Sequence, residues 1–394
     1  MKPIIAISAG DTNGIGYEVI LKTLHESHIL EICIPVVYGN ANTANLHAET
    51  LGQDYNSIKW NIITSPKEAK EDRCNLINCY EDNMPVVFGK PSKEAGQAAY
   101  SCLERACRDL KAGLADALVT APVNKDNIQS EQFKFDGHTE YLTSYFADEE
   151  HKESVMMLVG DSMRVALVCN HTPISKVAEA ITKERIISKL DILNKSLKED
   201  FTIRRPRIAV LALNPHAGDN GLLGKEENDI ITPAIEQAYE QGIYAFGPYS
   251  ADGFFGSGMY QHFDAILAMY HDQGLIPFKS MSMSGVNYTA GLPIVRTSPD
   301  HGTAYDIAGQ NKADKESFTH AIYMALDILQ NRKMNKELLA NPLAIKERVE
   351  RDNGERTRPP FLGFKTDTPA EEKGESGNTN SDNVTDNDNE TNNI

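Results

Sequence analysis

Short runs of Val, Ile and Leu recur along the chain, and each run ends near a turn that contains Gly, Asn, His or Pro. A short continuous apolar run is typical of a strand covered on both faces, as in a parallel sheet. This pattern predicts strands at Ile4–Ser8, Ile34–Tyr38, Ala117–Thr120, Val155–Val159, Val165–Cys169, Ile208–Leu213, Ala265–Met269 and Leu292–Val295.

Segments of helical periodicity follow several of these runs. They predict helices at Tyr17–Leu24, Glu94–Ala112, Ile174–Leu197, Asp229–Gln241 and Ser317–Gln330. Strands that alternate with helices indicate an α/β fold with a largely parallel sheet, in which ligands bind beyond the carboxyl ends of the strands. Residues 40–90 are the least regular stretch, where we predict only a weak helix and polar connections.

Length and charge narrow the class of protein. A chain of 394 residues favours two domains, with one large α/β unit as the alternative. The formal net charge of −17 disfavours nucleic acid and anionic membrane surfaces as partners. Residues 366–394 hold eight acids, one Lys and no aromatic residue, so we expect this acidic tail to be disordered.

The sequence also bears on location. The N-terminal residues include no apolar segment of signal-peptide length, and no apolar run approaches the ~20 residues of a membrane span. The six cysteines form no C-x-x-C pair, so we expect free thiols and no zinc ribbon. These features predict a cytoplasmic protein.

Three histidines follow three separate predicted strands. His171, His216 and His271 each stand just beyond an apolar run. Neutral imidazole is the commonest side-chain ligand of a borderline divalent metal, and three such ligands leave a position open for a substrate oxygen. The alternative, equally weighted, is three hydrogen-bonded loop residues. No H-E-x-x-H occurs, which argues against a zincin.

Two further motifs suit an anion. Gly10, Gly14 and Gly16 form a loop directly after the first strand, which either cradles an anion at a helix N-terminus or makes a tight strand–helix turn. The segment 136–141, DGHTEY, either caps a helix through Asp136 or Thr139, which spacing favours, or presents donors to a phosphate or carboxylate.

Basic residues and a second loop complete the candidate chemistry. Lys279 and Arg296, with Asn287 between them, would suit a phosphorylated substrate. After the last predicted strand, residues 297–309 form a small-residue loop with an acid and a histidine, which suits contact with a planar ring.

Together these segments resemble the 4-hydroxythreonine-4-phosphate dehydrogenase family of pyridoxal phosphate biosynthesis. The matching strings lie in order from residue 10 to residue 309: GDTNGIGYE, VTAPVNK, DGHTEY, CNHTPISKV, LNPHAG, MYHDQGLIPFK, GVNYTAGLPIVRTS and DHGTAYDIAG. The chain departs from the family pattern at Thr12, Asn13 and Tyr17, where Pro, Ala and Pro are expected, and in a shorter loop between Lys279 and Asn287.

The resemblance implies a two-domain α/β/α fold of the isocitrate/isopropylmalate dehydrogenase type, with the active site in the interdomain cleft. Residues 1–135 and 295–365 would form the first domain. Residues 136–294 would form the second, which carries the interface of a homodimer. The active sites would be shared between the subunits, with metal ligands from both chains.

The resemblance also implies roles for individual residues. The metal ligands would be His171, His216 and His271, and the ion would be Zn, Mg, Co or Mn. The cofactor would be NAD, with NADP as the alternative. Residues matched to substrate binding are His138, Thr139, Lys279, Asn287 and Arg296, and those matched to cofactor binding are His301, Gly302, Thr303 and Ala304.

The implied reaction is oxidation of 4-phosphooxy-L-threonine at C3 to a 3-oxo acid, which decarboxylates to 3-amino-2-oxopropyl phosphate. Asp252, Asp272 and Lys125 are equal candidates for the general base. Two alternatives stay open: a 4-phospho-D-threonate or D-erythronate dehydrogenase of sugar-acid catabolism, and a phosphate acyltransferase, which would not need three strand-end histidines. A non-catalytic binding protein is less compatible with a metal triad beside an anion-binding set.

Overall fold

The computed structural model describes residues 2–26, 28–52, 54–55, 58–282 and 284–342. These residues belong to one compact unit, Met1–Pro342. The predicted acidic tail, 366–394, and the end of the predicted first domain, 343–365, lie outside the described residues.

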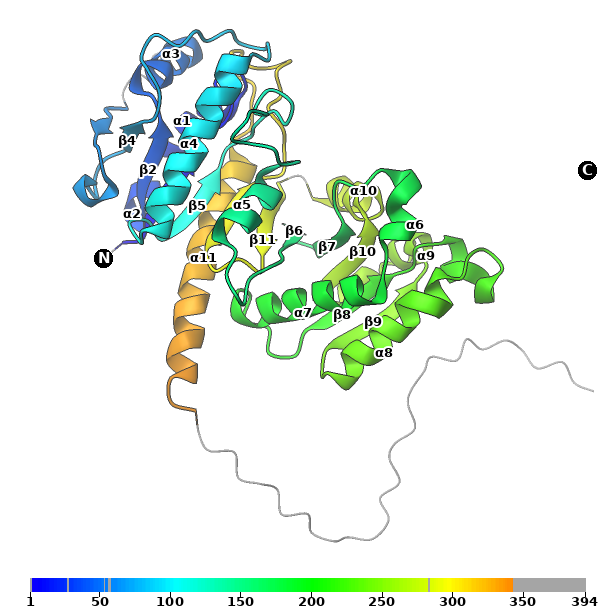
Figure 1. The fold of residues 1–394 in the computed structure, drawn as a ribbon. Coiled ribbons are helices and arrows are strands. Elements are labelled where there is room, and N and C mark those ends of the chain that lie inside the picture. Colours follow the sequence, from blue (N-terminus) through cyan, green and yellow to red (C-terminus); the bar gives the residue numbers. More distant parts are fainter. Residues whose placement is uncertain (1, 27, 53, 56–57, 283, 343–394) are drawn as a thin grey trace, which may run out of the picture. The chain divides into compact units, whose positions relative to one another are not determined.

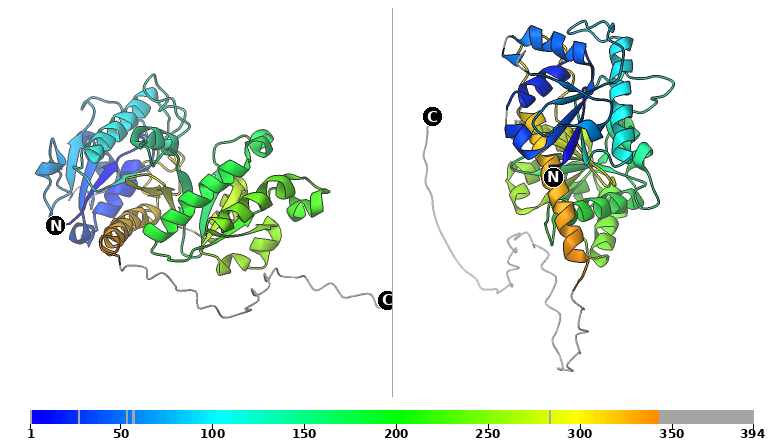
Figure 2. Two further views of the ribbon diagram at one scale, coloured as in Figure 1. Left: turned by 60° about the horizontal axis from the view of Figure 1, so that its bottom comes forward. Right: turned by 90° about the vertical axis from the view of Figure 1, so that its left-hand side faces the viewer.

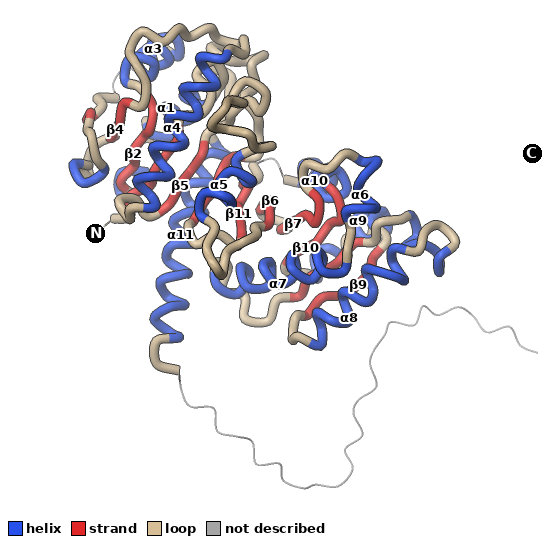
Figure 3. Tube along the Cα trace, viewed as in Figure 1, coloured by secondary structure: helices blue, strands red, loops and turns tan. Residues whose placement is uncertain are grey.

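A single sheet of twelve strands runs through this unit in the order β3-β4-β2-β1-β5-β12-β11-β6-β7-β10-β8-β9 (Figure 3). The strands are β1 Ile4–Ser8, β2 Ile34–Gly39, β3 Asn61–Ile62, β4 Asn75–Asn78, β5 Ala117–Thr120, β6 Val155–Val159, β7 Arg164–Cys169, β8 Arg207–Leu211, β9 Tyr244–Tyr249, β10 Ala265–Tyr270, β11 Val286–Ala290 and β12 Val295–Pro299.

Most neighbouring strands are parallel, as predicted. The antiparallel pairs are β11 with β12, β11 with β6, and β6 with β7. The strands β1 to β5 and β12 make one end of the sheet, and β6 to β11 make the other. The predicted α/β class is confirmed. The proposed division into two domains at residues 135 and 295 stays a prediction.

Helices cover both faces of the sheet (Figures 1 and 2). They are α1 Gly16–Leu24, α2 His28–Ile32, α3 Ala41–Leu51, α4 Lys93–Lys111, α5 His138–Phe146, α6 Val177–Ala180, α7 Lys183–Glu199, α8 Thr232–Glu240, α9 Ala251–Gly256, α10 His271–Met281 and α11 Glu316–Leu339.

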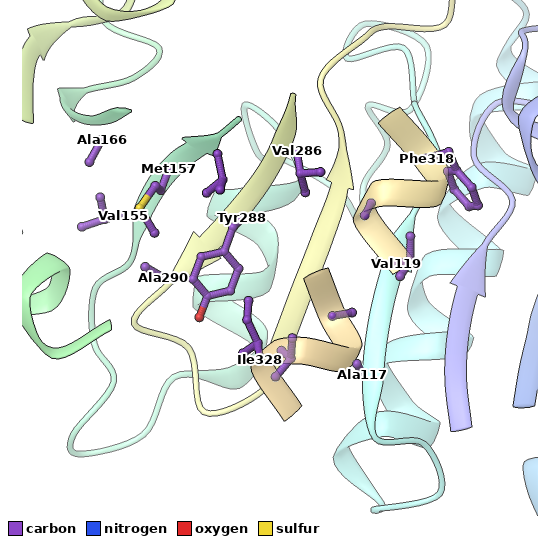
Figure 4. Packing of buried hydrophobic residues seen from close by; sticks show 14 of the residues in the cluster. Ala117, Val119, Val155, Met157, Ala166, Val286, Tyr288, Ala290, Phe318 and Ile328 are labelled. Atoms are coloured by element: carbon purple, nitrogen blue, oxygen red, sulfur yellow. The ribbon is translucent and has the colours of Figure 1, made fainter. Parts of the chain in front are cut away.

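The alternation of side chains along each strand explains the two covered faces. Ile5 and Ile7 of β1 join the core beneath α1 and α11, whereas Ala6 between them joins the core beneath α4. Strands of this kind are apolar at every position because both faces are buried. In the first core, the ring of Tyr288 on β11 packs among side chains that include Ile328 of α11 (Figure 4).

Several predicted elements differ from the structure. The predicted helix Ile174–Leu197 is broken, and α7 begins only at Lys183, where the Thr182 hydroxyl accepts a hydrogen bond from the Arg185 amide. The last predicted strand lies too early, because β12 continues through polar residues that are buried, Arg296 to Ser298. Strands β3, β4, β9 and β11 were not predicted.

Two expectations about the whole chain can be compared with the structure. All six cysteines are free thiols, as predicted. Among the described helices, none combines the length and apolar character needed to cross a bilayer.

Candidate active site

A pocket of about 260 Å³ opens at the carboxyl ends of β5, β7 and β10 and beside β11 and β12. It gathers most of the predicted site residues: Lys125, His138, Thr139, His171, His271, Lys279, Asn287, Arg296, His301 and Gly302. A larger pocket of about 600 Å³, lined by residues of α7 and α11, contains none of them. The smaller pocket is therefore the candidate active site.

Arg296 supplies a buried positive charge to this pocket. The residue is 2% exposed, and its guanidinium donates hydrogen bonds to the hydroxyls of Thr120 (Nη2–Oγ1 2.7 Å) and Thr289 (Nη1–Oγ1 3.1 Å). Burial lowers the pKa of Arg296 to about 10. Within the described part of the chain no carboxylate lies within ion-pair distance of it. A buried cation of this kind is costly unless an anion neutralises it.

Lys279 adds a second cation beside an acid that was not predicted. Its ammonium lies 3.2 Å from a carboxylate oxygen of Asp300 and donates to the Asp300 carbonyl at 3.1 Å. Burial raises the pKa of Asp300 above its ordinary value, although Lys279 opposes the shift. The carboxyl group of Asp300 is therefore more easily protonated than an exposed aspartate.

Three further side chains present buried polar atoms that have no hydrogen-bond partner among the described residues. They are Nε2 of His138, Oδ1 of Asn287 and Nε2 of His301, and all three residues line the pocket. Burial lowers the pKa of both histidines, that of His138 strongly, so both rings are held neutral. Buried polar atoms without partners are rare in proteins, which indicates that a ligand supplies the missing partners.

His171 is held in a defined tautomer. Its Nδ1 lies 3.0 Å from Oε1 of Glu140, and its Nε2 lies 2.7 Å from the ammonium of Lys125. Nδ1–H donates to the carboxylate, so Nε2 carries the lone pair and accepts from Lys125. Partial burial would raise the pKa of Glu140, but hydrogen bonding by His171 and its own backbone, with Lys125 nearby, lowers it overall. A carboxylate behind a histidine is the usual arrangement at metal sites.

The three strand-end histidines follow neighbouring strands. β10 lies between β7 and β8, and His171, His271 and His216 follow β7, β10 and β8. His171 and His271 line the candidate pocket, whereas His216 lines an adjoining one. In the part of the chain that the structure describes, no three His, Cys, Asp or Glu residues form a group able to hold a metal. One copy of the chain therefore does not bring the predicted trio together.

Helix α10 separates these two pockets. His271, Leu275 and Lys279 stand four residues apart and face the candidate pocket, while Asp272 faces the adjoining one. Asp252 lies in the same adjoining pocket as Asp272 and His216. The hydrogen bond from the Ser250 hydroxyl lowers the pKa of the exposed Asp252 carboxyl. Of the three candidate bases, only Lys125 lines the candidate pocket.

The glycine loop forms a tight turn and does not line the candidate pocket. The amide of Ile15 donates to the carbonyl of Thr303 at 3.0 Å. A Cβ atom on Gly14 would lie 2.7 Å from that same carbonyl oxygen, so only glycine fits this approach. The glycine loop therefore packs directly against the predicted cofactor loop at Thr303. Thr303 and Ala304 do not line the pocket, unlike His301 and Gly302.

The three residues that depart from the family pattern, Thr12, Asn13 and Tyr17, are buried and do not line the pocket. Asn13 accepts a hydrogen bond from the Val87 amide and donates to the Lys90 carbonyl. The hydroxyl of Tyr17 lies 2.8 Å from that of Tyr80 and accepts from the Asn40 amide. These side chains tie the irregular segment after β4 to the glycine loop.

Sequence reasoning did not assign Glu140 or Asp300 a role. Glu140 lies in the first turn of α5, which begins at His138 after Gly137, and among the described residues no side chain caps this helix. The interpretation of Asp136 and Thr139 as caps is wrong. Asp300 directly precedes the predicted cofactor loop, and only the structure places it against Lys279, 21 residues away.

Known proteins match most of the chain. The family described as pyridoxal phosphate biosynthetic protein PdxA matches residues 31–325. A 4-hydroxythreonine-4-phosphate dehydrogenase of Bacteroides thetaiotaomicron is 51% identical over 355 residues, which is 90% of this chain and 96% of the relative. One of Aquifex aeolicus is 40% identical over 330 residues, covering 84% of this chain and 99% of the relative.

Comparison with solved structures gives the same family. A crystal structure of 4-hydroxythreonine-4-phosphate dehydrogenase from Klebsiella pneumoniae superposes with a TM-score of 0.72 at 34% identity and covers 84% of this chain and 99% of its own. The family model matches most of this chain, and the relatives are well above 30% identical to it. The chain therefore belongs to the PdxA family of pyridoxal phosphate biosynthetic proteins.

Proposed function

We propose that the protein is an oxidoreductase that oxidises 4-phosphooxy-L-threonine at C3 with NAD as hydride acceptor. The resulting 3-oxo acid loses CO2 to give 3-amino-2-oxopropyl phosphate, a step in pyridoxal 5'-phosphate biosynthesis. The names of the relatives support the reaction. The observation that carries the proposal is Arg296, a buried cation with no carboxylate of the described residues within ion-pair distance, which faces a pocket that Lys279 also lines.

The phosphate of the substrate neutralises Arg296 and Lys279. A guanidinium that is already fixed by Thr120 and Thr289 is pre-organised for a phosphate oxygen, so little side-chain entropy is lost on binding. The partnerless atoms of His138 and Asn287 supply further hydrogen bonds to the polar substrate. Because His138 is held neutral, its ring can donate or accept without adding charge.

Oxidation at C3 requires a group that removes the hydroxyl proton. Lys125, acting as the neutral amine, is favoured over Asp252 and Asp272 as this base, because only Lys125 lines the pocket and contacts His171. Asp300 joins it as a candidate, since its carboxyl group is buried beside Lys279. The loop from His301 to Ala304, which follows directly, is proposed to bind the nicotinamide cofactor.

The imidazoles fit a divalent metal such as Zn, Mg, Co or Mn in one respect: Glu140 fixes the tautomer of His171, so Nε2 carries the lone pair, and a metal there would replace the hydrogen bond that Nε2 accepts from Lys125. When bound, the metal supplies a Lewis acid for the C3 oxygen. A single chain does not assemble His171, His216 and His271. We therefore propose a cytoplasmic homodimer in which a second copy completes the ligand set.

Spectrophotometric assay of NADH and NADPH formation tests the proposal. The substrates are 4-phosphooxy-L-threonine and 4-phospho-D-threonate, each with NAD and NADP and each with a chelator control. We expect metal-dependent turnover of the L-threonine derivative with NAD. Preference for 4-phospho-D-threonate would support the sugar-acid alternative, and absence of reduced nucleotide with both substrates would refute a dehydrogenase.

A further inference from the structure

The segment that carries His216 has an unusual backbone. Six consecutive residues have positive φ angles between 44° and 94°: His216, Ala217, Gly218, Asp219, Asn220 and Gly221. Four of these are not glycine. A left-handed conformation costs an L-residue roughly 1–2 kcal/mol, so a run of them persists only where neighbouring groups hold it in place.

The side chain of Glu227 holds this segment. Its Oε1 accepts hydrogen bonds from the amides of Leu213 (2.8 Å) and Asn214 (2.7 Å), and its Oε2 accepts from Nδ2 of Asn214 (3.0 Å). Oε2 also lies 2.6 Å from the position that a Cβ on Gly218 would occupy. One carboxylate therefore bonds the backbone just before His216 and fills the space beside Gly218, in the middle of the left-handed turn, that a side chain there would need.

Glu227 is a buried charge that is stabilised by hydrogen bonds alone. The residue is 2% exposed, and among the described residues no Lys, Arg or His lies within ion-pair distance of it. Burial of a carboxylate without a cation is unfavourable, and three accepted hydrogen bonds are what offset it here. An apolar residue would avoid this cost but would leave the amides of Leu213 and Asn214 without their acceptor.

The residues that Glu227 bonds, Leu213 and Asn214, come directly before Pro215 and His216. Asn214 has an extended backbone (φ −95°, ψ 157°), the conformation that the following Pro215 favours. Because proline fixes its own φ, the orientation of Asn214 sets the direction in which the chain enters His216. The imidazole then lies exposed at the pocket that also holds Asp252 and Asp272.

We propose that Glu227 is a positioning residue that fixes the left-handed turn and so presents the His216 imidazole to the metal. This inference rests on the proposed function, in which His216 is a metal ligand. Glu227 contacts neither substrate nor metal, and it acts through its hydrogen bonds to the amides of Leu213 and Asn214 and to the Asn214 side chain.

Three variants of the full-length protein test the role. Glu227→Ala removes all three accepted bonds. Glu227→Gln keeps the Oε1 acceptor but turns an amide NH2 toward that of Asn214, so it loses one bond without emptying the site. Glu226→Gln is the matched control, because the half-buried Glu226 also accepts from Asn214 (2.7 Å) but bonds none of the backbone amides of residues 213–218.

Two readouts are measured. Hydrogen exchange of peptides spanning residues 208–223 reports the turn, and titration with Co²⁺, followed by its visible absorption, reports the ligand geometry. For Glu227→Ala we expect faster exchange in this segment alone, and a loss of Co²⁺ affinity of about 10- to 100-fold with an altered spectrum. Glu227→Gln loses roughly 2- to 10-fold, the equivalent of one net hydrogen bond, and Glu226→Gln stays within about 2-fold.

The outcomes are distinguishable. Unchanged exchange, or faster exchange with an unchanged Co²⁺ affinity and spectrum, would overturn the role of Glu227 while leaving the metal site intact. If wild-type protein binds no Co²⁺, the metal-dependent function itself fails. If Glu227→Ala does not fold, the exchange and spectrum of Glu227→Gln decide alone, and wild-type behaviour in that variant overturns the inference.

Discussion

Replacement of Arg296 by Met tests whether the pocket is built for phosphate. In the ligand-free protein two effects oppose each other. Replacing buried charges by apolar side chains is often neutral or stabilising by about 1–4 kcal/mol. The hydroxyls of Thr120 and Thr289, both fully buried, lose their donor, which costs about 1–3 kcal/mol each. At the middle of these ranges the two effects nearly cancel, so we expect the free energy of unfolding to fall by only about 2 kcal/mol.

Substrate binding should change far more. Loss of one partner from a desolvated, charge-assisted contact costs about 2–5 kcal/mol. This corresponds to a fall in kcat/KM of roughly 30-fold to several thousand-fold. The fall should be confined to the phosphorylated substrate, because 4-hydroxy-L-threonine has no phosphate for Arg296 to bind.

The assay compares NADH formation by wild type and Arg296→Met with both substrates, and urea unfolding gives the stability of each protein. Arg204→Met, which removes an exposed arginine, is the control for net charge. An equal loss on both substrates would show that Arg296 does not contact the phosphate. Full activity with the phosphorylated substrate would refute the assignment of the pocket.

Three further predictions follow from particular contacts. Glu140→Gln weakens the fixed tautomer of His171, so competition with a chelator should show metal affinity about 10- to 100-fold lower; equal affinity would exclude the contact from metal binding. Burial lowers the pKa of His47 to about 4. Between pH 6.5 and pH 4 this histidine is therefore protonated in the unfolded chain but neutral in the folded chain, which favours unfolding. Stability should fall by about 3 kcal/mol between pH 6.5 and pH 4 on this account, and His47→Gln should flatten the pH dependence of the urea midpoint; an unaltered slope would contradict it. His216→Asn keeps a residue that tolerates positive φ, so it should abolish NADH formation with the melting temperature nearly unchanged, whereas retained turnover would remove His216 from the site.

The sequence predicted those parts of the fold in which both faces of a strand are apolar. Val165–Cys169 was recognised for that reason, since its side chains alternate between two cores. Strand β11, Val286–Ala290, was not, because Asn287 faces the pocket and Thr289 binds Arg296. In β11, polar residues that serve the site interrupt the apolar pattern, so this strand was not predicted, whereas β5, β7 and β10 keep apolar runs up to the pocket.

The candidate site was predicted where topology alone brings residues together. His171 and His271 follow β7 and β10, which pair in parallel, so their shared pocket follows from the strand order. The position of His216 depends on a left-handed turn, which no sequence pattern predicted. Contacts such as Glu140 with His171 join residues 31 apart, and only the packed structure gives their distance.

The proposed function requires three imidazoles, from two copies of the chain, to bind one cation beside the Arg296 pocket. A crystal structure of the Co²⁺-loaded protein with anomalous diffraction at the cobalt edge tests it most directly. We expect one anomalous peak per active site, within bonding distance of His171, His216 and His271 and close to Glu140 and Lys125. A peak at other residues, or three imidazoles too far apart to share one ion in any observed oligomer, would contradict it.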